Sequence, residues 1–446
     1  MQNILNAIIA QGGYPLYVGG YVRDQLLGVP SKDIDIEVYD MLYDDLIDVL
    51  SQFGHVNTVG ASFGVIKLRT HDNQEIDFSF PRRDSKSSKG HKGFTIEIDP
   101  GMTPFDAALR RDFTINSMAM TKDGKIIDFF NGQEDLRKGI LRHTSDAFVE
   151  DPLRVLRGFQ FCGRFDLYST LHTYAMCRGL VGEYQHLSIE RVWGEWWKWA
   201  SKSQKPSAGL EFLLRAGWLR LFPEVFHTIK VPQEPEWHPE GDVFEHTLHV
   251  VDKAAEIAVR EDLLEVERGV LVLSALCHDM GKASTTRLSD DGLRIVSPGH
   301  AHTSHTKDFL QSIGAPKSIS CRVQEIVREH MVHLNDVSDK TVRRFLSRLN
   351  YATYQDVIYL IEADHSGRPP LPGGLPQNAK RIREIAYGMG NEILPIVMGR
   401  HLIELGLKPG THFGNILEQA FEAQLDGEFY DVESGKTWVS QHFMTL

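Results

Sequence analysis

The chain has 446 residues, of which 42% are hydrophobic and 24% charged, and its formal net charge is −12. This length exceeds what one hydrophobic core usually organises and predicts two to four domains. No apolar run approaches the length of a membrane span, and the N-terminal stretch lacks a basic leader and a cleavage site, so we expect a cytoplasmic protein without a membrane partner. Four cysteines without a CxxC pair fit a reducing compartment and argue against a disulfide framework and a zinc finger.

The first part of the chain alternates short helical and strand patterns. The helical patterns cover 3–10 and 21–27, and the strand patterns cover 15–18, 33–38, 64–69, 75–80 and 125–130. This alternation predicts a mixed α/β domain over residues 1–140.

The remainder of the chain is predicted to be helical. Amphipathic helical runs dominate after residue 141, and they are broken at the Pro-, Gly- and Ser-containing stretches 201–207, 230–242 and 367–376. We place domain boundaries at these breaks. The expected parts are 141–229, 230–366 and 367–446.

One N-terminal stretch reads YVGGYVRDQLLGVPSKDIDIEVY. Gly19 and Gly20 lie between a strand and a helix, where the backbone can approach a phosphate closely and the helix N-terminus adds partial positive charge. Asp33 and Asp35 alternate in an extended strand and therefore face one side, about 7 Å apart. Paired carboxylates suit Mg²⁺ in phosphoryl or nucleotidyl transfer, and Asp77 on a neighbouring strand is a candidate third carboxylate. Taken alone, such a pair is also typical of a solvated strand.

A basic segment follows the strands. Residues 82–92 hold five Lys or Arg side chains against one acid. Because phosphate binding is driven by Lys and Arg, this segment favours a nucleic-acid contact that the net charge alone would not indicate. A solvated run of charge is the alternative interpretation.

Two further motifs are LRRDFTINSMAM at 109–120 and VEDPLRVLR at 149–157. Together with VGGYVRD and KDIDI they resemble, in order and spacing, the class II tRNA nucleotidyltransferase and bacterial poly(A) polymerase family. The resemblance covers residues 14–225. It implies a polymerase β-like α/β nucleotidyltransferase head followed by an all-α neck and body.

The resemblance implies a role for each motif. The nucleotide-binding entry motif corresponds to Gly19, Gly20, Arg23 and Asp24, and the metal-binding carboxylates correspond to Asp33 and Asp35, with Asp77 a less direct match. The motif that contacts triphosphate and ribose corresponds to Arg110, Arg111, Asp112 and Asn116, since Arg binds phosphate oxygens and Asp or Asn reads a hydroxyl. Helix or turn capping is the alternative for Asp112 and Asn116.

The last of these motifs implies a base template made of protein. Asp151 and Arg154 are three residues apart and are expected on one helix face. A carboxylate accepts a proton from the amino group of cytosine or adenine while a guanidinium donates to the adjacent ring nitrogen, and uracil and guanine present the reverse pattern. Arg157 is expected to orient the base or phosphate, and Glu190, Arg191 and Glu195 are expected to brace the template helix. A surface ion pair is the alternative.

A histidine-rich region lies in the second half. Residues 226–365 hold 11 of the 20 histidines, and their order resembles an HD-domain phosphohydrolase. The resemblance implies metal ligands at His246, His278, Asp279 and Asp364, with His300 and His330 facing the phosphate or a second ion. Mixed His and Asp ligation favours a transition metal such as Ni²⁺, Mn²⁺ or Co²⁺. Lys282 either contacts phosphate or lies on a helix surface.

The combination of both parts resembles the HD-containing bacterial tRNA CCA-adding enzymes. It implies Mg²⁺-dependent addition of C, C and A to the tRNA 3′ end from CTP and ATP, with phosphatase, 2′-nucleotidase and 2′,3′-cyclic phosphodiesterase activity in the HD domain. Alternatives are a poly(A) polymerase, an enzyme that adds only CC or only A, an HD phosphohydrolase whose N-terminal half only binds RNA, and a non-enzymatic RNA-binding scaffold.

Overall fold

A computed structural model describes residues 1–446 apart from 31–32, 59–63, 87–93, 391 and 445–446. Residues 87–92 of the basic segment predicted at 82–92 therefore lie outside the described residues. The chain divides into two compact units, Met1–Leu221 and Phe222–Leu446. Among the described helices, none combines the length and the hydrophobicity that a membrane crossing requires.

The first unit contains a mixed sheet with the strand order β3-β4-β5-β2-β1-β8-β9. The pair β2–β5 is parallel, and the other neighbours in the sheet are antiparallel. The strands are β1 (Tyr14–Val18), β2 (Asp35–Tyr39), β3 (Gly54–Asn57), β4 (Val65–Thr70), β5 (Glu75–Ser79), β8 (Ala119–Met120) and β9 (Ile126–Ile127). A separate antiparallel pair joins β6 (Arg82–Lys86) to β7 (Phe94–Ile98).

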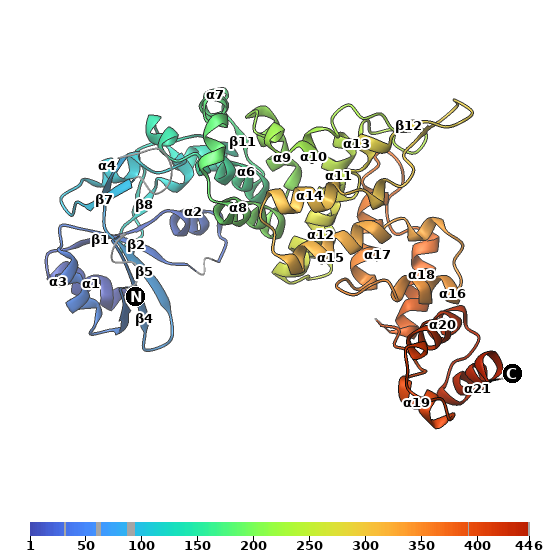
Figure 1. The fold of residues 1–446 in the computed structure, drawn as a ribbon. Coiled ribbons are helices and arrows are strands. Elements are labelled where there is room, and N and C mark those ends of the chain that lie inside the picture. Colours follow the sequence, from blue (N-terminus) through green and yellow to red (C-terminus); the bar gives the residue numbers. More distant parts are fainter. Residues whose placement is uncertain (31–32, 59–63, 87–93, 391, 445–446) are drawn as a thin grey trace. The chain divides into compact units, whose positions relative to one another are not determined.

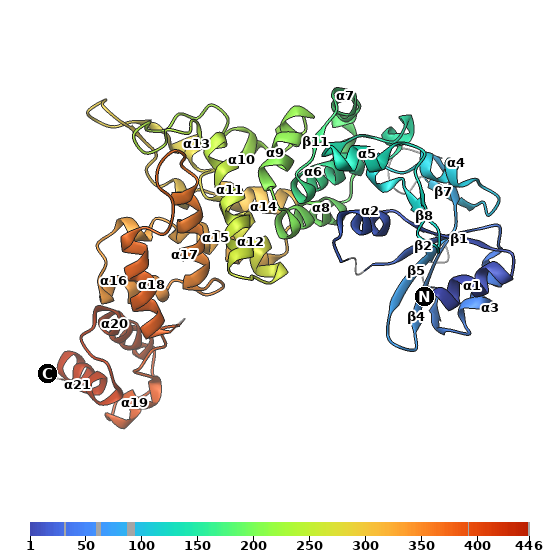
Figure 2. The ribbon, with the colours of Figure 1, turned by 180° about the vertical axis from the view of Figure 1, so that it is seen from behind.

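Two helices cover one face of this sheet, α1 (Gln2–Ala10) and α3 (Tyr43–Leu50), which lie side by side in Figure 1 and, seen from behind, in Figure 2. Because side chains alternate along a strand, Ile36 and Val38 of β2 are fully buried in the core beneath these helices. Asp35 and Glu37, which alternate with Ile36 and Val38, therefore face the opposite side of the sheet. The alternation leaves that side of β2 available for polar groups.

The rest of the first unit is mostly helical. Its helix α6 packs against α8 and α9, and Trp196 and Trp199 of α8 are fully buried there. Besides α1 and α3, the described helices of this unit are α2 (Gly20–Leu27), α4 (Pro104–Leu109), α5 (Gly132–Arg137), α6 (Leu153–Phe165), α7 (Leu171–Gly179), α8 (Ile189–Lys202) and α9 (Pro206–Arg215). Short 3-10 turns cover Thr114–Asn116, Asp146–Glu150, Val181–His186 and Leu219–Leu221, and β10 (Ile140–Leu141) pairs with β11 (Tyr168–Ser169).

The second unit is helical apart from one short antiparallel pair, β12 (Arg287–Leu288) with β13 (Ile295–Val296), among its described residues. Its centre is formed by α11, α12, α15 and α17, which pack against one another. The helices are α10 (Pro223–Phe226), α11 (Val243–Arg260), α12 (Glu265–Cys277), α13 (Lys282–Thr285), α14 (His305–Ser312), α15 (Lys317–Glu329), α16 (Asp339–Leu346), α17 (Tyr354–Ser366), α18 (Gln377–Met389), α19 (Gly399–Glu404), α20 (His412–Asp426) and α21 (Val432–Phe443). Two 3-10 turns cover His300–His302 and Val332–Leu334.

The predicted fold class is confirmed, because a mixed α/β head is followed by a mostly helical remainder. Two predicted strands differ most from the expected ranges. β2 begins at Asp35 rather than at residue 33, since its ladder with β5 starts at the Asp35–Asp77 pair and its ladder with β1 ends at Ile36. The pattern at 125–130 forms a strand only at Ile126–Ile127. The division of the chain into four domains stays a prediction.

Candidate active sites

A cavity of about 500 Å³ in the first unit gathers residues from all four N-terminal motifs. Ten of the predicted site residues line it: Gly19, Gly20, Arg23, Asp35, Arg111, Asp112, Asn116, Asp151, Arg154 and Arg157. Its lining includes seven basic side chains and three acidic ones. This excess of positive charge suits a polyanionic ligand although the whole chain carries a net charge of −12.

The glycine pair begins α2 at the edge of this cavity. Gly19 precedes the helix with φ 64°, a left-handed backbone conformation that glycine adopts without strain. A Cβ at Gly19 would lie 3.0 Å from Nη1 of Arg111. The absence of a side chain at Gly19 therefore allows the guanidinium of Arg111 to lie close to the backbone.

The carboxylates lie on neighbouring strands. Asp35 of β2 lies directly opposite Asp77 of β5 in the parallel ladder, and Asp77 accepts a hydrogen bond of 3.1 Å from Nζ of Lys67. Asp33 is exposed and lies two residues before β2. Burial raises the pKa of Asp35, and the negative charges of Asp77 and Asp33 add to this shift, while Arg111 opposes it. Carboxylates that repel one another in this way suit a shared divalent cation.

A hydrogen-bonded network crosses the cavity floor. Arg23 donates to Oδ1 of Asn116 at 2.6 Å, and Nδ2 of Asn116 donates to Oδ1 of Asp112 at 3.0 Å. Arg157 then donates from Nε to Oδ2 of Asp112 at 2.6 Å. Burial opposes ionisation of Asp112, but Arg157 and the hydrogen bond from Asn116 outweigh it, so the pKa of Asp112 lies below its usual range. The network fixes two arginines that come from widely separated parts of the chain.

Asp112 was predicted to read a ribose hydroxyl, and both of its carboxylate oxygens already accept hydrogen bonds from the protein. The backbone N–H of Phe113 supplies one of them, at 2.8 Å. The structure thus gives Asp112 a clear organising contact with Arg157. Its contact with a ligand stays a prediction.

The expected template pair differs from its predicted geometry. Asp151 does not lie on the helix with Arg154, because α6 begins at Leu153 and Asp151 has extended backbone angles of φ −125° and ψ 104°. A residue before proline disfavours the helical conformation, and Pro152 follows Asp151. Oδ1 of Asp151 instead accepts a hydrogen bond from the backbone N–H of Leu153 at 3.1 Å and caps the start of α6.

Both members of this pair still line the cavity, and each is held by other groups. Nη2 of Arg191 donates to Oδ2 of Asp151 at 2.7 Å, as the expected bracing role of Arg191 requires. Arg154 donates to the backbone carbonyls of Ala147 and Arg110 at 2.6 and 2.7 Å. The side chains of Asp151 and Arg191 keep 30% and 25% of their surface exposed, so a base can reach the carboxylate.

Four predicted site residues lie outside the lining of this cavity: Asp24, Asp33, Asp77 and Arg110. Asp24 pairs with Arg23 at 2.7 Å. Arg110 lines an adjacent cavity of about 290 Å³, together with Arg111 and Arg154.

Part of the cavity lining was not predicted from the sequence. Phe161 and Arg164 of α6 and Lys198 of α8 also line the cavity. Arg23 and Arg157 lie over the ring of Phe161, each 5.2 Å from its centroid. The signal was present, because positions 154, 157, 161 and 164 are spaced by three and four residues and so share one helix face.

The second unit contains a buried cluster of imidazoles and carboxylates. The predicted HD residues all belong to it: His246, His278, Asp279, His300, His330 and Asp364. Groups able to hold a metal are His246 with His278 and Asp279, and Asp279 with His300 and His330. Asp279 belongs to both groups. Its Oδ2 lies 3.2 Å from Nε2 of His278, and its Oδ1 lies 3.3 Å from Nε2 of His300.

The imidazoles are oriented by hydrogen bonds on their outer nitrogens. The Nδ1 atoms of His278, His300 and His330 lie 2.8, 2.9 and 2.6 Å from the carbonyl oxygens of Ala275, Ser297 and Val327. This arrangement places the proton on Nδ1 and turns the Nε2 lone pair inward. Such an outer shell is typical of metal-ligating histidines.

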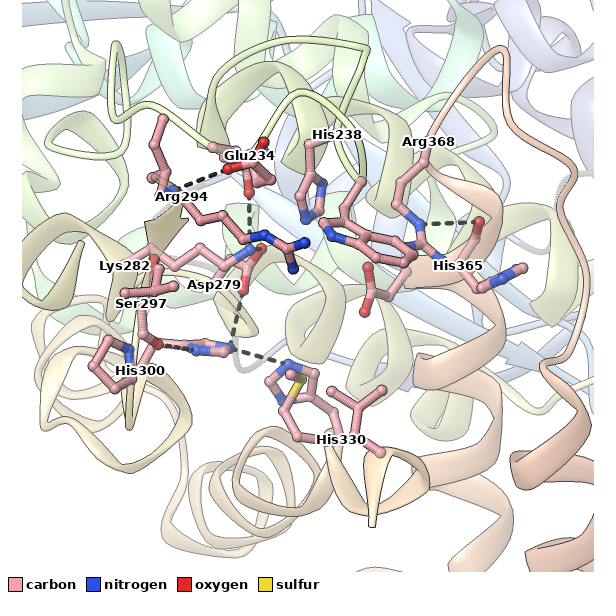
Figure 3. A pocket seen from close by; sticks show the side chains of 18 of the residues that line it. Glu234, His238, Asp279, Lys282, Arg294, Ser297, His300, His330, His365 and Arg368 are labelled. Atoms are coloured by element: carbon pink, nitrogen blue, oxygen red, sulfur yellow. Dashed lines mark hydrogen bonds and ion pairs between the residues drawn. The ribbon is translucent and has the colours of Figure 1, made fainter. Parts of the chain in front are cut away.

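A cavity of about 580 Å³ opens onto the cluster and is shown in Figure 3. His300 and His330 turn toward one another there, and Lys282 reaches Asp279 at 2.7 Å and Gln233 at 2.8 Å. Burial opposes the charge of Asp279, yet His278 and Lys282 hold its pKa well below the usual range. Burial and the neighbouring His278 and His300 lower the pKa of His330 to about 3, so this imidazole is neutral and able to ligate.

Two residues of this region were missed. His238 and Glu240 form a third group with His246 that could hold a metal, and His238 lines the cavity. They belong to the stretch 230–242, which sequence analysis treated as a break between domains. The available signal in the sequence was WHPE at 237–240, which is followed closely by EH at 245–246.

Comparisons with known proteins also identify two separate parts of the chain. Residues 16–142 match the poly A polymerase head domain family, and residues 243–385 match the HD domain family. The multifunctional CCA protein of Nitrosococcus oceani is 32% identical over 415 residues, which cover 91% of this chain and 96% of that protein.

Two solved structures share the fold. One is a Bacillus stearothermophilus CCA-adding enzyme in complex with CTP, with a TM-score of 0.67, 19% identity, and coverage of 99% of this chain and 96% of that one. The other is a Thermotoga maritima CCA-adding enzyme in complex with tRNA, with a TM-score of 0.62, 20% identity, and coverage of 99% and 94%. At these identities the likeness concerns the fold.

Proposed function

The chain belongs to the family of multifunctional CCA proteins, and we propose on this basis that it adds C, C and A to the 3′ end of tRNA, using CTP and ATP. The observation that carries the proposal is the cavity of the first unit, in which Gly19, Asp35, Arg111 and Asp151 come together from four separate motifs. A tRNA substrate also favours the cytoplasm as the place of action.

The basic lining of the cavity would bind the triphosphate. Arg23 and Arg157 are already fixed by Asn116 and Asp112, so they lose little conformational freedom when a ligand binds. Asp33, Asp35 and Asp77 fit a Mg²⁺ site, because their like charges crowd together beside the cavity. Mg²⁺, when bound, would supply charge stabilisation at the α-phosphate and at the attacking 3′-hydroxyl.

Asp151 and Arg154 would select the base. The exposed part of the Asp151 carboxylate keeps acceptor capacity beyond its bonds with Arg191 and Leu153. Arg154 uses two of its five N–H donors on backbone carbonyls, and the others are available to a ring nitrogen. Cytosine and adenine complement this pair, whereas uracil and guanine would leave a buried donor or acceptor unpaired.

Product sizing tests the proposal. Purified protein is incubated with tRNA ending at the discriminator base and with each labelled nucleotide, and products are separated at one-nucleotide resolution. We expect two additions with CTP alone, none with ATP alone and three with both. A long ladder with ATP would indicate a poly(A) polymerase, and two additions with both nucleotides would indicate a CC-adding enzyme. A tRNA that already ends in CCA serves as the control.

A second function is favoured by the histidine cluster, in which four Nε2 atoms converge around Asp279 and Asp364. We propose that this cluster hydrolyses phosphoesters such as 2′,3′-cyclic nucleotides and phosphomonoesters. Its mixed nitrogen and oxygen donors fit Ni²⁺, Mn²⁺ or Co²⁺ better than Mg²⁺. Such an ion, when bound, would supply Lewis acidity at the phosphorus centre.

Hydrolysis of 2′,3′-cyclic AMP with each of these ions, before and after chelation, tests the second function. Activity that depends on the ion and disappears with the chelator supports it. If none of the ions gives hydrolysis of a cyclic nucleotide or a phosphomonoester, the HD region serves as a structural support for tRNA.

A further inference from the structure

Glu240 is a buried acid to which neither proposed activity assigns a role. Its Oε1 lies 2.9 Å from Nδ1 of His238 and 2.7 Å from Nδ1 of His246. The side chains of Glu240 and His246 have no exposed surface. Burying a carboxylate is costly unless its charge is used, so this placement calls for an explanation.

The histidines of the cluster differ in what holds their outer nitrogen. Three of them, His278, His300 and His330, have Nδ1 within hydrogen-bonding distance of a backbone carbonyl three residues earlier. The Nδ1 of His246 instead faces the carboxylate of Glu240. A charged acceptor holds an N–H more strongly than a carbonyl does, and it increases the electron density on the opposite nitrogen.

The inner nitrogen of His246 points into the proposed metal site. Its Nε2 lies 3.1 Å from Oδ1 of Asp364, 3.3 Å from Nε2 of His278 and 3.8 Å from Oδ2 of Asp279. These atoms come from α11, from α17 and from the two residues just after α12. His246 therefore connects Glu240 on its outer side to three predicted ligands on its inner side.

The loop that carries Glu240 is fixed by its own contacts. Asp242 caps α11 by accepting a hydrogen bond from the backbone N–H of Glu245 at 2.9 Å, and its other oxygen accepts from the backbone N–H of Lys230 at 2.7 Å. Gly241, which lies between Glu240 and Asp242, has φ 136°, a backbone conformation that favours glycine. The position of Glu240 is thus set by backbone and capping contacts, so the carboxylate is pre-arranged for His246.

We propose that Glu240 is a positioning residue of the HD metal centre, which holds the Nδ1–H of His246 so that its Nε2 lone pair faces the metal. This inference rests on the proposed function of the HD cluster as a metal site. A carboxylate that only ties the loop to α11 would be needed for folding but would leave metal affinity unchanged. The two roles therefore separate in a binding measurement.

Calorimetric titration of the full, tag-free chain with Ni²⁺ alone makes this separation. In Glu240→Gln, which keeps the size of the side chain but removes its charge, we expect the Kd to rise by about 10- to 100-fold, as for other partners of metal-bound histidines. The matched control is Glu325→Gln, because Glu325 is equally a buried acid of the second unit but accepts hydrogen bonds from the backbone of residues 350–352 and from the side chain of Asn350. Its Kd is expected to match that of the unchanged protein.

Melting with a chelator present shows whether each variant folds. If Glu240→Gln does not fold, Glu240→Asp takes its place, because aspartate keeps the charge but is too short to reach His246 in the same way. A higher Kd for Ni²⁺ is again expected. A folded variant at position 240 with unchanged Kd overturns the inference. If the unchanged protein binds Ni²⁺ no better than His278→Ala does, the proposed metal site fails instead.

Discussion

The two candidate metal sites of this protein differ in the charges that surround their carboxylates. In the first unit, the carboxylates of Asp35 and Asp77 lie side by side on two strands, and burial with mutual repulsion raises the pKa of Asp35. In the second unit, histidines and Lys282 surround Asp279 and hold its pKa well below the usual range. At the first site the charges of Arg111 and Lys67 do not offset the burial and repulsion that raise the pKa of Asp35, whereas at the second site the protein's own cationic groups hold the pKa of Asp279 low.

This difference indicates how each site is used. Oxygen ligands that remain partly exposed suit Mg²⁺, which keeps waters and arrives with substrate phosphates. Imidazoles whose outer nitrogens are fixed by the protein suit a resident transition metal. We therefore expect the two chemistries to respond to different ions and different mutations.

The largest effect is expected at Asp35. Of the three candidate Mg²⁺ carboxylates, Asp35 is the one that lines the cavity. Because metal-assisted charge stabilisation contributes several kcal/mol, nucleotide addition by Asp35→Ala should fall by about 10³-fold or more. Primer-extension assays with tRNA and CTP measure this loss. Asp33→Ala is expected to act in the same direction.

The control for Asp35 is Glu75→Gln, an exposed acid on β5, the strand that carries Asp77. It changes the same formal charge without touching the cavity, so addition should continue at the original rate. Addition that survives in Asp35→Ala would mean that the carboxylates on β2 and β5 are not the metal site.

A smaller effect, on stability, is expected at Asp112. Asp112→Ala leaves Arg157, Asn116 and the backbone of Phe113 without their shared acceptor, which should lower the free energy of unfolding by about 3 kcal/mol. Tryptophan fluorescence during urea unfolding measures it, because five of the seven tryptophans precede residue 222. The control is Glu134→Gln, at an exposed acid, which should leave the urea concentration at the unfolding midpoint unchanged.

The pKa of Asp112 gives this prediction a pH dependence. Because its folded pKa is lowered, its contribution is fully present above the unfolded value of about 4 and is lost as the pH falls toward the folded pKa. The difference in the free energy of unfolding between the unchanged protein and Asp112→Asn should therefore decrease below about pH 4. A gap that stays constant with pH would show that the charge of Asp112 is not what stabilises the network.

The smallest effect is expected on base selection. Asp151→Ala should reduce the preference for CTP and ATP over UTP and GTP by about 1–3 kcal/mol, by analogy with bidentate base readout. Arg191→Ala should reduce it less, because Arg191 only holds one oxygen of Asp151. The ratio of kcat/KM among the four nucleotides measures both. Unchanged ratios in Asp151→Ala would make Asp151 a helix cap and nothing more.

Much of the first site could be predicted, because its residues lie in compact motifs whose spacing reflects strand and helix periods. The geometry at Asp151 could not, since a spacing of three predicts one helix face only if both residues are helical, and Pro152 pushes Asp151 into an extended conformation. Arg164 was within reach of the same periodicity, because it lies seven residues after Arg157 on α6.

The second site was predicted through its ligand order but not through its outer shell. The carbonyl partners of His278 and His330 follow from helix geometry, since Ala275 and Val327 lie three residues earlier at the ends of α12 and α15. Glu240 has no such regularity. It lies in an irregular loop, and only the folded loop brings it against His246, so no local pattern could indicate its role.

The reciprocal assay of two variants tests the central claim most directly. The full chain carrying Asp35→Ala and the full chain carrying both His278→Ala and Asp279→Ala are each tested for CCA addition with Mg²⁺ and for cyclic nucleotide hydrolysis with Ni²⁺. We predict that the first variant loses only addition and the second only hydrolysis, with each spared activity close to that of the unchanged protein. Loss of both activities in either variant, while it remains folded, would contradict the assignment of one chemistry to each unit.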